Sequence, residues 1–465
     1  MNNQGFVSPD EIRALFSSAM SDMYKSEVPL YGTLLDLVAQ TNEKVMEDAP
    51  EVAAQLRWTG EIRRLSLERH GAIRVGTAAE LSTIRRLFAV MGMQPVGYYD
   101  LSPAGVPVHA TAFRAVHESS LQISPFRVFT SLLRLELIDN VELRTLASSI
   151  LAKRNIFTAR VQELIAKFED EGGLNPAHAH EFVAQALETF RWHTQATVTA
   201  QEYHQLHDQH RLVADVVAFK GPHINHLTPR TLDIDRIQAG MPACGITPKA
   251  IVEGPPRRHC PILLRQTSFK ALQERVAFIG PDDAPGSHTA RFGEIEQRGA
   301  ALTPKGRALY DQLLSATRAE LKALPSEHNA ARYGELLERN FAEFPDSHEQ
   351  MRQQNLAYFR YFVTERGIAA SRNEVRPRTL DELIAAGHVH FEPLVYEDFL
   401  PVSAAGIFQS NLGDNAQAAY AITSNQADFH SALGASVLNE LELYADTQRR
   451  SLLDCCATLD LPALV

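Results

Sequence analysis

The chain has 465 residues, of which 45% are hydrophobic and 22% are charged, with a formal net charge of −11 and a pI near 5.9. A chain of this length forms two or three domains, or one enlarged domain, and buries a large core without disulfide bonds. The acidic balance argues against nucleic acid or an anionic membrane as the main partner. A small anionic substrate remains compatible with it, because a few local arginines can outweigh a diffuse negative field.

Cysteine usage and hydropathy favour a cytoplasmic protein. The chain contains four cysteines: Cys244, Cys260, Cys455 and Cys456. They form neither a CxxC pair nor a regular framework, which indicates a reducing compartment. No apolar run approaches the roughly 18–20 residues that span a bilayer. The N-terminus is typical of a helix start rather than a signal peptide, because Ser8 and Glu11 form a capping box around Pro9.

Residues 1–66 are predicted to form a helical segment, and a mixed module follows at residues 67–138. Residues 70–76 predict a strand, and Thr77 and Glu80 form a capping box for the helix after it. Three further strands are predicted at residues 93–100, 106–116 and 126–138. The order of the first module is therefore strand, helix, strand, strand, strand.

A helical insertion is predicted at residues 139–219, and the order of the first module then recurs at residues 220–303. The elements of this second module are a strand at 222–227, a helix at 232–239, and strands at 250–253, 261–272 and 289–301. We interpret the two modules as a structural repeat, although their sequence identity is low. The fold expected is α+β, with two βαβββ modules forming a sheet core between inserted and flanking helices.

Residues 304–465 are predicted to form a mainly helical C-terminal region. The helices expected there span residues 305–324, 331–341, 348–365 and 428–453. Residues 376–412 mix a short helix with strand or loop.

Three residues that are distant in the sequence are candidate metal ligands: His70, His226 and Glu294. The two histidines lie on the first strands of the two modules, and these strands become neighbours if the modules pair about a pseudo-twofold axis. Two imidazoles and one carboxylate on one side of a metal leave coordination positions open, which suits non-haem iron(II). The spacing alone also allows each residue to be a hydrogen-bonded group in a polar interior.

Arg74 is a candidate carboxylate clamp. Alternate residues of a strand share a face, so Arg74 lies on the same side as His70, and the small Ala72 between them leaves room. An arginine can pair with a carboxylate through two hydrogen bonds. The metal and the clamp would then flank one short dicarboxylate, whereas the alternative is a structural arginine. Gln266 is a candidate for orienting the histidines, or an ordinary strand amide.

Other histidine clusters carry a weaker signal. His223 lies three positions before His226, and this odd offset places the two on opposite faces of a strand, so only one is expected to bind metal. The repeat of His204, His207 and His210 drifts around a polar helix, and a solvated helix face is the favoured interpretation.

Three motifs carry a resemblance to a known family: residues 69–76 (RHGAIRVG), 221–226 (GPHINH) and 291–294 (RFGE). At these motifs, specific in combination and weak one by one, the chain resembles the 2-oxoadipate dioxygenase/decarboxylase family, also called 2-hydroxyglutarate synthases, over nearly its whole length. That family is similar in its core to the vicinal oxygen chelate superfamily, in agreement with the doubled module order.

The resemblance implies that the three candidate ligands hold Fe(II), and that Arg74 binds the distal carboxylate of the substrate. It also implies that Val402 and Ser403 contact the substrate from a loop near residues 396–412. The implied reaction converts 2-oxoadipate and O₂ to D-2-hydroxyglutarate and CO₂, a step of lysine breakdown, without a separate 2-oxoglutarate cosubstrate. No catalytic side chain beyond the metal centre is expected.

Two other interpretations remain open from the residues alone. One is a non-redox isomerase or lyase of the same fold that uses Zn²⁺, Ni²⁺ or Mn²⁺. The other is a small-molecule binding protein without catalytic activity. Oxygen uptake with 2-oxoadipate distinguishes the dioxygenase from both.

Overall fold

The structure is a computed structural model that describes residues 5–269, 273–280, 285–289, 291–323, 325–370, 379–399 and 425–461. Its first helices all begin at prolines: α1 (Pro9–Glu27), α2 (Pro29–Asp48) and α3 (Pro50–Trp58). Proline suits the first helical turn, where its missing N–H is not needed. The capping box of Ser8 and Glu11 is present at the start of α1, which confirms that prediction.

The first module has the predicted order of elements. It comprises β1 (Arg69–Val75), α4 (Ala78–Val90), β2 (Gln94–Asp100), β3 (Val108–Arg114) and β4 (Arg127–Leu133). β1 runs parallel to β4, and β3 lies antiparallel between β4 and β2. Thr77 and Glu80 form the predicted capping box of α4. The sequence missed the short helix α5 (Glu118–Ile123), and the last strand ends five residues earlier than predicted, because a 3₁₀ turn follows Arg134.

The second module repeats this arrangement in reduced form. It comprises β6 (Leu227–Pro229), α11 (Ile234–Gly240), β7 (Leu264–Ser268) and β10 (Glu294–Arg298). β10 pairs antiparallel with β7, as β4 does with β3, and a parallel bridge from Arg230 to Glu296 joins it to the first strand. An antiparallel bridge between Glu253 and Gln266 takes the place of the predicted strand at 250–253. The second module therefore keeps the predicted strand–helix–strand–strand–strand order, with one strand reduced to a single bridge.

The two modules meet through their first strands. β6 pairs antiparallel with β1, giving one sheet of order β2-β3-β4-β1-β6. The strand predicted at 222–227 starts later, at Leu227, because Pro222 has no N–H for a ladder and the Asn225 N–H instead donates to the carbonyl of Ala72 (3.0 Å). The prediction that the first strands of the two modules are neighbours is therefore confirmed.

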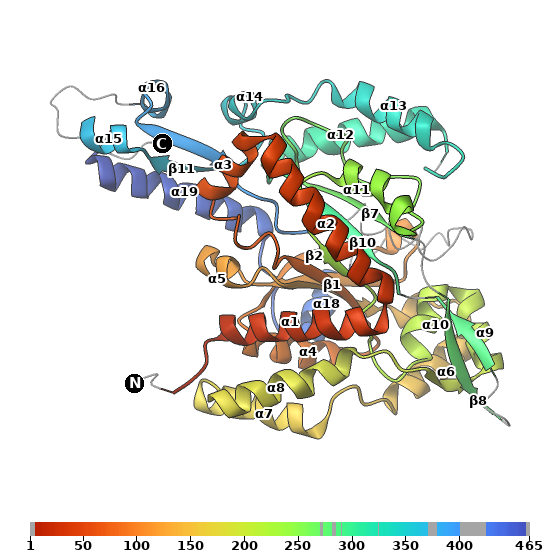
Figure 1. Cartoon of the computed structure of the whole chain (residues 1–465). Helices are drawn as coiled ribbons and strands as arrows, with labels where there is room; N and C mark the ends of the chain where they lie inside the picture. The colour runs from red at the N-terminus through yellow and green to blue at the C-terminus, as the bar shows by residue number, and fades with distance from the viewer. Residues whose placement is uncertain are drawn as a thin grey trace.

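The helical insertion contains α6 (Val141–Ala152), α7 (Ala159–Glu171), α8 (Pro176–Leu187), α9 (Ala200–Gln209) and α10 (Arg211–Val217). The predicted helical insertion is interrupted by a strand, β5 (Gln195–Thr199). β5 forms a small sheet with two strands that the sequence did not predict, β8 (Glu274–Ile279) and β9 (Pro285–His288). Figure 1 shows β8 beside α9 and α10 at one end of the molecule.

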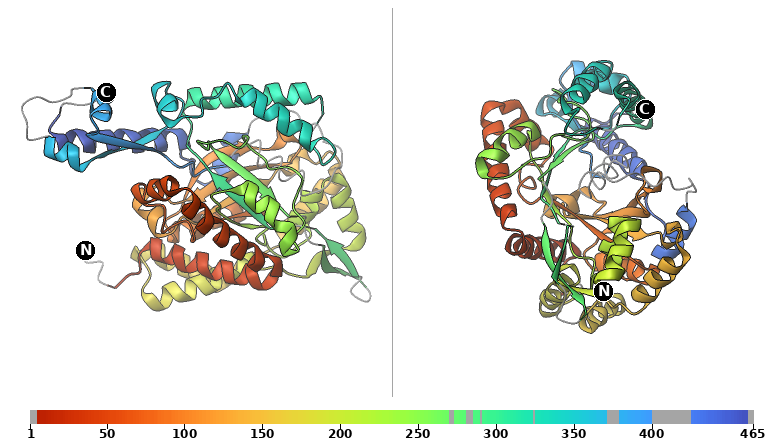
Figure 2. Two further views of the ribbon diagram at one scale, coloured as in Figure 1. Left: turned by 45° about the horizontal axis from the view of Figure 1, so that its top comes forward. Right: turned by 90° about the vertical axis from the view of Figure 1, so that its right-hand side faces the viewer.

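The C-terminal region contains α12 (Pro304–Leu321), α13 (Ala330–Phe341), α14 (His348–Gln353), β11 (Phe359–Val363), α15 (Glu365–Ala370), α16 (Leu380–Ala385), β12 (Val389–Pro393), α18 (Gln426–Leu433) and α19 (Glu440–Leu459). The helix predicted at 348–365 is wrong after α14, because the aromatic-rich β11 pairs with β12. The single helix predicted at 428–453 is two helices, since Gly434 ends α18 with a φ of 70°. β11 and α19 form an arm that projects from the body (Figure 2).

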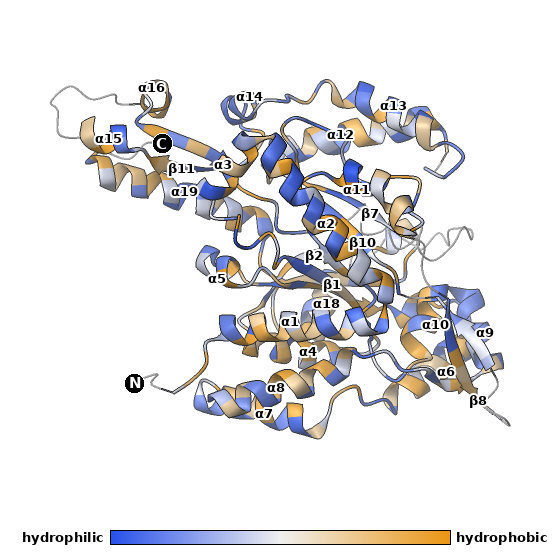
Figure 3. Cartoon of the chain, in the orientation of Figure 1, coloured by the Kyte–Doolittle hydropathy of each residue, from blue (hydrophilic) through white to orange (hydrophobic). Residues whose placement is uncertain are grey.

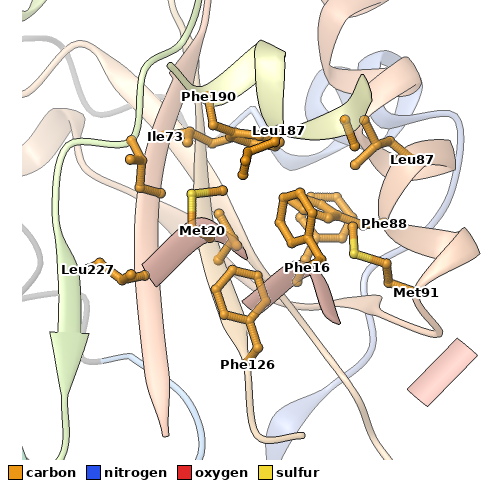
Figure 4. Close-up of a cluster of buried hydrophobic side chains, with 14 of the residues drawn as sticks. Phe16, Met20, Ile73, Leu87, Phe88, Met91, Phe126, Leu187, Phe190 and Leu227 are labelled. Carbon is orange, nitrogen blue, oxygen red and sulfur yellow. The ribbon is translucent and has the colours of Figure 1, made fainter. Parts of the chain in front are cut away.

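Apolar side chains pack α1 against the central sheet. Phe16 and Met20 of α1 lie against Ile73 of β1, Phe88 of α4 and Leu227 of β6, and all five are fully buried (Figure 4). Each buried side chain of this size stabilises the fold by about 1.5–3 kcal/mol. The outer faces of the helices carry the polar residues (Figure 3). Within the described residues, we find no helix both long and apolar enough to cross a membrane.

Candidate metal centre

His70 lies on β1 at the junction of the two modules, where it pairs with Thr228 of β6. Its side chain is buried, and its Nε2 atom lies 3.0 Å from Oε1 of Glu294. On the other side of the ring, Nδ1 lies 2.7 Å from Oε2 of Glu296. A carboxylate beside Nδ1 favours the tautomer with its proton there, which leaves the Nε2 lone pair directed at the site.

His226 precedes β6 and approaches from the second module. Its ring centroid lies 5.2 Å from that of His70, and its Nε2 lies 3.7 Å from Oε1 of Glu294. The ring is buried, yet among the described residues neither of its nitrogens has a hydrogen-bond partner. Burial lowers the pKa of His226 to about 4, against the attraction of Glu294, so the imidazole is neutral at physiological pH. A neutral imidazole is the form that binds a metal.

Glu294 is the first residue of β10 and supplies the carboxylate. Its Oε1 accepts hydrogen bonds from Thr228 Oγ1 (3.0 Å) and Gln266 Nε2 (3.1 Å). Its Oε2 is buried and accepts none within the described part of the chain. Gln266 thus orients the carboxylate, which corrects the expectation that it orients the histidines.

The three predicted ligands can share one metal ion. One ligand atom from each of His70, His226 and Glu294 lies within 4.8 Å of the other two, and all three residues are buried. A buried polar atom without a partner costs free energy. A divalent cation would satisfy the lone pairs of the His226 ring and of Glu294 at once, so the donor set fits a metal. This trio is the one such group of His, Cys, Asp and Glu in the described residues.

A network of buried charges supports the His70 side of the centre. Arg298 donates to both oxygens of Glu296 (2.7 and 2.9 Å). Burial is the largest single influence and raises the pKa of Glu296, but Arg298, His70 and Arg127 together outweigh it and lower the pKa to about 2. Behind this pair lies a further group of buried ion-paired residues: Arg64, Glu68, Arg127, Arg230, Glu61 and Glu397. None of these residues is recognisable as an ion pair from the sequence, because nothing local marks a charged residue that is paired across the fold.

Arg74 lies on β1 and is buried. Its Nη1 donates to Oδ2 of Asp215 on α10, at 2.6 Å. The guanidinium also contributes to the lowered pKa of His226, so its charge acts on the metal centre. Asp215 was not a candidate from the sequence, because its partner Arg74 lies 141 positions away.

The other candidate residues are distributed as follows. His223 points to Asp215 (Nε2 to Oδ1, 3.2 Å), so only His226 of that pair joins the trio, as predicted. Val402 and Ser403 lie outside the described residues. The described part of their segment ends at Phe399, whose ring packs edge-on against His70 with the centroids 4.9 Å apart. The described start of the predicted substrate loop therefore borders the site.

Known proteins match this chain over almost its full length. Residues 16–411 match the 2-oxoadipate dioxygenase/decarboxylase family. A 2-oxoadipate dioxygenase/decarboxylase of Pseudomonas putida is 72% identical over 459 residues, covering 99% of both chains. That of Escherichia coli is 56% identical over 450 residues, covering 97% of this chain and 98% of the relative.

A solved structure agrees with these matches. The crystal structure of the hydroxyglutarate synthase from Pseudomonas putida in complex with 2-oxoadipate has a TM-score of 0.93 and 71% sequence identity. The match covers 98% of this chain and 100% of that chain. The chain therefore belongs to the 2-oxoadipate dioxygenase/decarboxylase family.

Proposed function

We propose that this protein is an iron(II)-dependent dioxygenase/decarboxylase that converts 2-oxoadipate and O₂ to 2-hydroxyglutarate and CO₂. The observation that carries the proposal is the buried set of two histidines and one glutamate at the junction of the modules. Two nitrogen donors and one oxygen donor leave coordination positions open, which suits a catalytic iron(II). A structural zinc site, in contrast, has four protein ligands and no open position. Membership of the family supports 2-oxoadipate as the substrate.

His70, His226 and Glu294 would hold the metal, which supplies a binding point for the 2-oxo acid and for O₂. Arg74 would bind the distal carboxylate and thereby fix the carbon chain relative to the centre, which lowers the barrier by positioning. The rings of Phe399 and Phe292 pack against the two histidines and exclude water from them.

The remaining sequence-based expectations extend this proposal. Val402 and Ser403 would contact the substrate, and their segment follows Phe399, which borders His70. The cytoplasmic location stays a prediction. All four cysteines are free, as expected in a reducing compartment.

The test is an oxygen-consumption assay on protein loaded anaerobically with iron(II). We expect one O₂ consumed and one CO₂ released for each 2-oxoadipate, without added 2-oxoglutarate. Conversion of 2-oxoadipate without O₂ uptake would contradict the proposal and favour the isomerase or lyase. Binding of 2-oxoadipate without turnover would favour the non-catalytic binding protein.

The ligand assignment has a matched control. His70→Ala, His226→Ala and Glu294→Ala should each abolish turnover and reduce the bound iron, because each removes one of three donors. His180→Ala removes an exposed histidine of α8 and should change neither quantity. Full activity in any of the three ligand variants would remove that residue from the centre.

A further inference from the structure

Asp215 is a buried carboxylate that joins four separate parts of the chain. It lies on α10, and its side chain is only 2% exposed. Its Oδ2 accepts the hydrogen bond from Arg74 of β1 (2.6 Å), and its Oδ1 accepts one from His288 Nε2 of β9 (2.9 Å). His223, before β6, also places Nε2 3.2 Å from Oδ1. Both carboxylate oxygens are therefore committed, so the side chain has little freedom to turn.

A second layer holds His288 in place. Because His288 Nε2 donates to Asp215, its Nδ1 accepts a hydrogen bond, and the hydroxyl of Tyr203 on α9 lies 2.8 Å from it. The ring of Trp192 lies parallel to that of His288, with the centroids 6.1 Å apart, and Phe219 packs on it at 4.6 Å. The result is a chain of contacts from Tyr203 through His288 and Asp215 to Arg74, enclosed by aromatic rings.

The charges of this chain are consistent with a fixed ion pair. Burial opposes ionisation of Asp215, but the neighbouring His223 and Arg74 outweigh it and hold the pKa of Asp215 well below its usual range. The carboxylate thus stays charged and matches the charge of the guanidinium. A guanidinium is planar and rigid, so fixing one of its nitrogens restricts the plane of the whole group.

The elements that carry this chain of contacts are additions to the doubled βαβββ core. Asp215 and Tyr203 lie in the helical insertion, and His288 lies on the three-stranded sheet of β5, β8 and β9. The metal ligands, in contrast, lie on or beside core strands. Function is commonly adapted by elements added to a common core. Through Asp215, the added elements contact the guanidinium of Arg74, which lies on the same strand as His70.

We propose that Asp215 is a positioning residue, held by His288 and Tyr203, that fixes the orientation of Arg74 and thereby sets the length of dicarboxylate that the site accepts. The proposal rests on the proposed function, because it requires Arg74 to bind the distal carboxylate. The competing explanation is that Asp215 only neutralises a buried arginine and supports the fold. In that case its loss would affect every ligand of the site equally.

The experiment compares Asp215→Asn with the wild type on two ligands of the same carbon number. 2-Oxoadipate carries the distal carboxylate, whereas 2-oxohexanoate lacks it and is measured as a competitor through its inhibition constant. We expect Asp215→Asn to raise KM for 2-oxoadipate about tenfold with a small change in kcat, since it removes substrate binding rather than chemistry. The inhibition constant of 2-oxohexanoate should stay within about twofold. Equal weakening of both ligands, or no change, would overturn the proposal.

Chain-length selectivity is the second readout. The preference of the wild type for 2-oxoadipate over 2-oxoglutarate and 2-oxopimelate, one methylene shorter and longer, should decrease in Asp215→Asn. Tyr203→Phe removes only the terminal hydroxyl and should shift KM in the same direction by less, which keeps the test open if Asp215→Asn does not fold. Asp208→Asn, at an exposed position of α9, is the matched control and should behave as the wild type. An unchanged preference in both test variants would contradict the proposal.

A double-mutant cycle separates this proposal from the proposed function. If Asp215 acts through Arg74, Asp215→Asn should have no further effect on KM in the Arg74→Ala background. Additive effects would show that Asp215 does not act through Arg74, and would leave the clamp intact. An unchanged KM in Arg74→Ala alone would instead reject the clamp assignment itself.

Discussion

The orientation of one imidazole determines how the centre can bind a metal. His70 contacts Glu294 through Nε2 and Glu296 through Nδ1, so its two nitrogens have different tasks. Glu296 is itself fixed by Arg298, and all four residues are buried. A carboxylate that holds the far nitrogen of a metal-binding histidine fixes both the tautomer and the ring orientation. Glu296 therefore prepares His70 before any metal arrives.

This arrangement predicts a loss of metal affinity in Glu296→Gln. The variant keeps the shape of the side chain but removes the charge beside Nδ1, and we expect iron(II) or Mn(II) to bind about 10- to 100-fold more weakly. Anaerobic metal titration measures the change, with Glu335→Gln on the exposed side of α13 as the control. Unchanged affinity in Glu296→Gln would show that His70 does not depend on this carboxylate.

At the level of single residues, the sequence identified the three proposed ligands but not the residues that support them. His70 and His226 could be paired because equivalent strands of a repeat become neighbours. Glu294 was a candidate because it lies on the last predicted strand of the second module, and the family resemblance then supported all three residues. Glu296 and Asp215 gave no such signal, since their roles depend on contacts with residues that only the fold brings near. A buried ionic residue looks the same in a sequence as a solvated one.

Among the secondary structure elements, the predictable ones carry their own local signals. α1 and α4 have capping boxes, and the strands of the first module are bounded by turns and by a helix with a clear period. β5 and β11 were missed because each has only five residues beside helical segments, and long-range pairing decides the conformation of such short segments. The β8–β9 hairpin depends in the same way on its pairing with β5.

The packing of α18 on β3 predicts a pH dependence of stability. His109 of β3 lies under Phe429 of α18, with the ring centroids 4.7 Å apart, and burial lowers its pKa to about 4, aided by Arg134. In the unfolded chain a histidine titrates near about 6.5. Below that pH the unfolded state takes up the proton first, so the stability contributed by neutral His109 is present above pH 6.5 and is lost as pH falls toward 4.

We therefore expect His109→Gln to flatten this part of the stability curve. The free energy of unfolding of the metal-free protein should fall less steeply between pH 6.5 and 4 in the variant. The difference in slope corresponds to up to about one proton fewer taken up on unfolding. Urea denaturation at several pH values measures the slope. A variant with the same slope as the wild type would show that His109 is not the titrating group. The remaining candidates would be His210, which caps α10, and His226, because the pKa of each is also about 4.

For the whole molecule, the repeat places the centre at the junction of its two halves. β1 and β6 pair antiparallel, His70 and His226 come from opposite halves, and β10 adds Glu294. Neither module holds all three proposed ligands, so the candidate site forms only when both modules have folded and joined. The helical insertion and the small β5-β8-β9 sheet then reach Arg74 from outside the core, through Asp215.

The most direct test of this account is an anomalous difference map from crystals of the iron(II)-loaded protein, measured at the iron absorption edge. We predict one peak per chain, about 2.0–2.2 Å from a nitrogen of His70, a nitrogen of His226 and an oxygen of Glu294. A peak held by other residues, or iron-loaded crystals without a peak between these three side chains, would contradict the central claim.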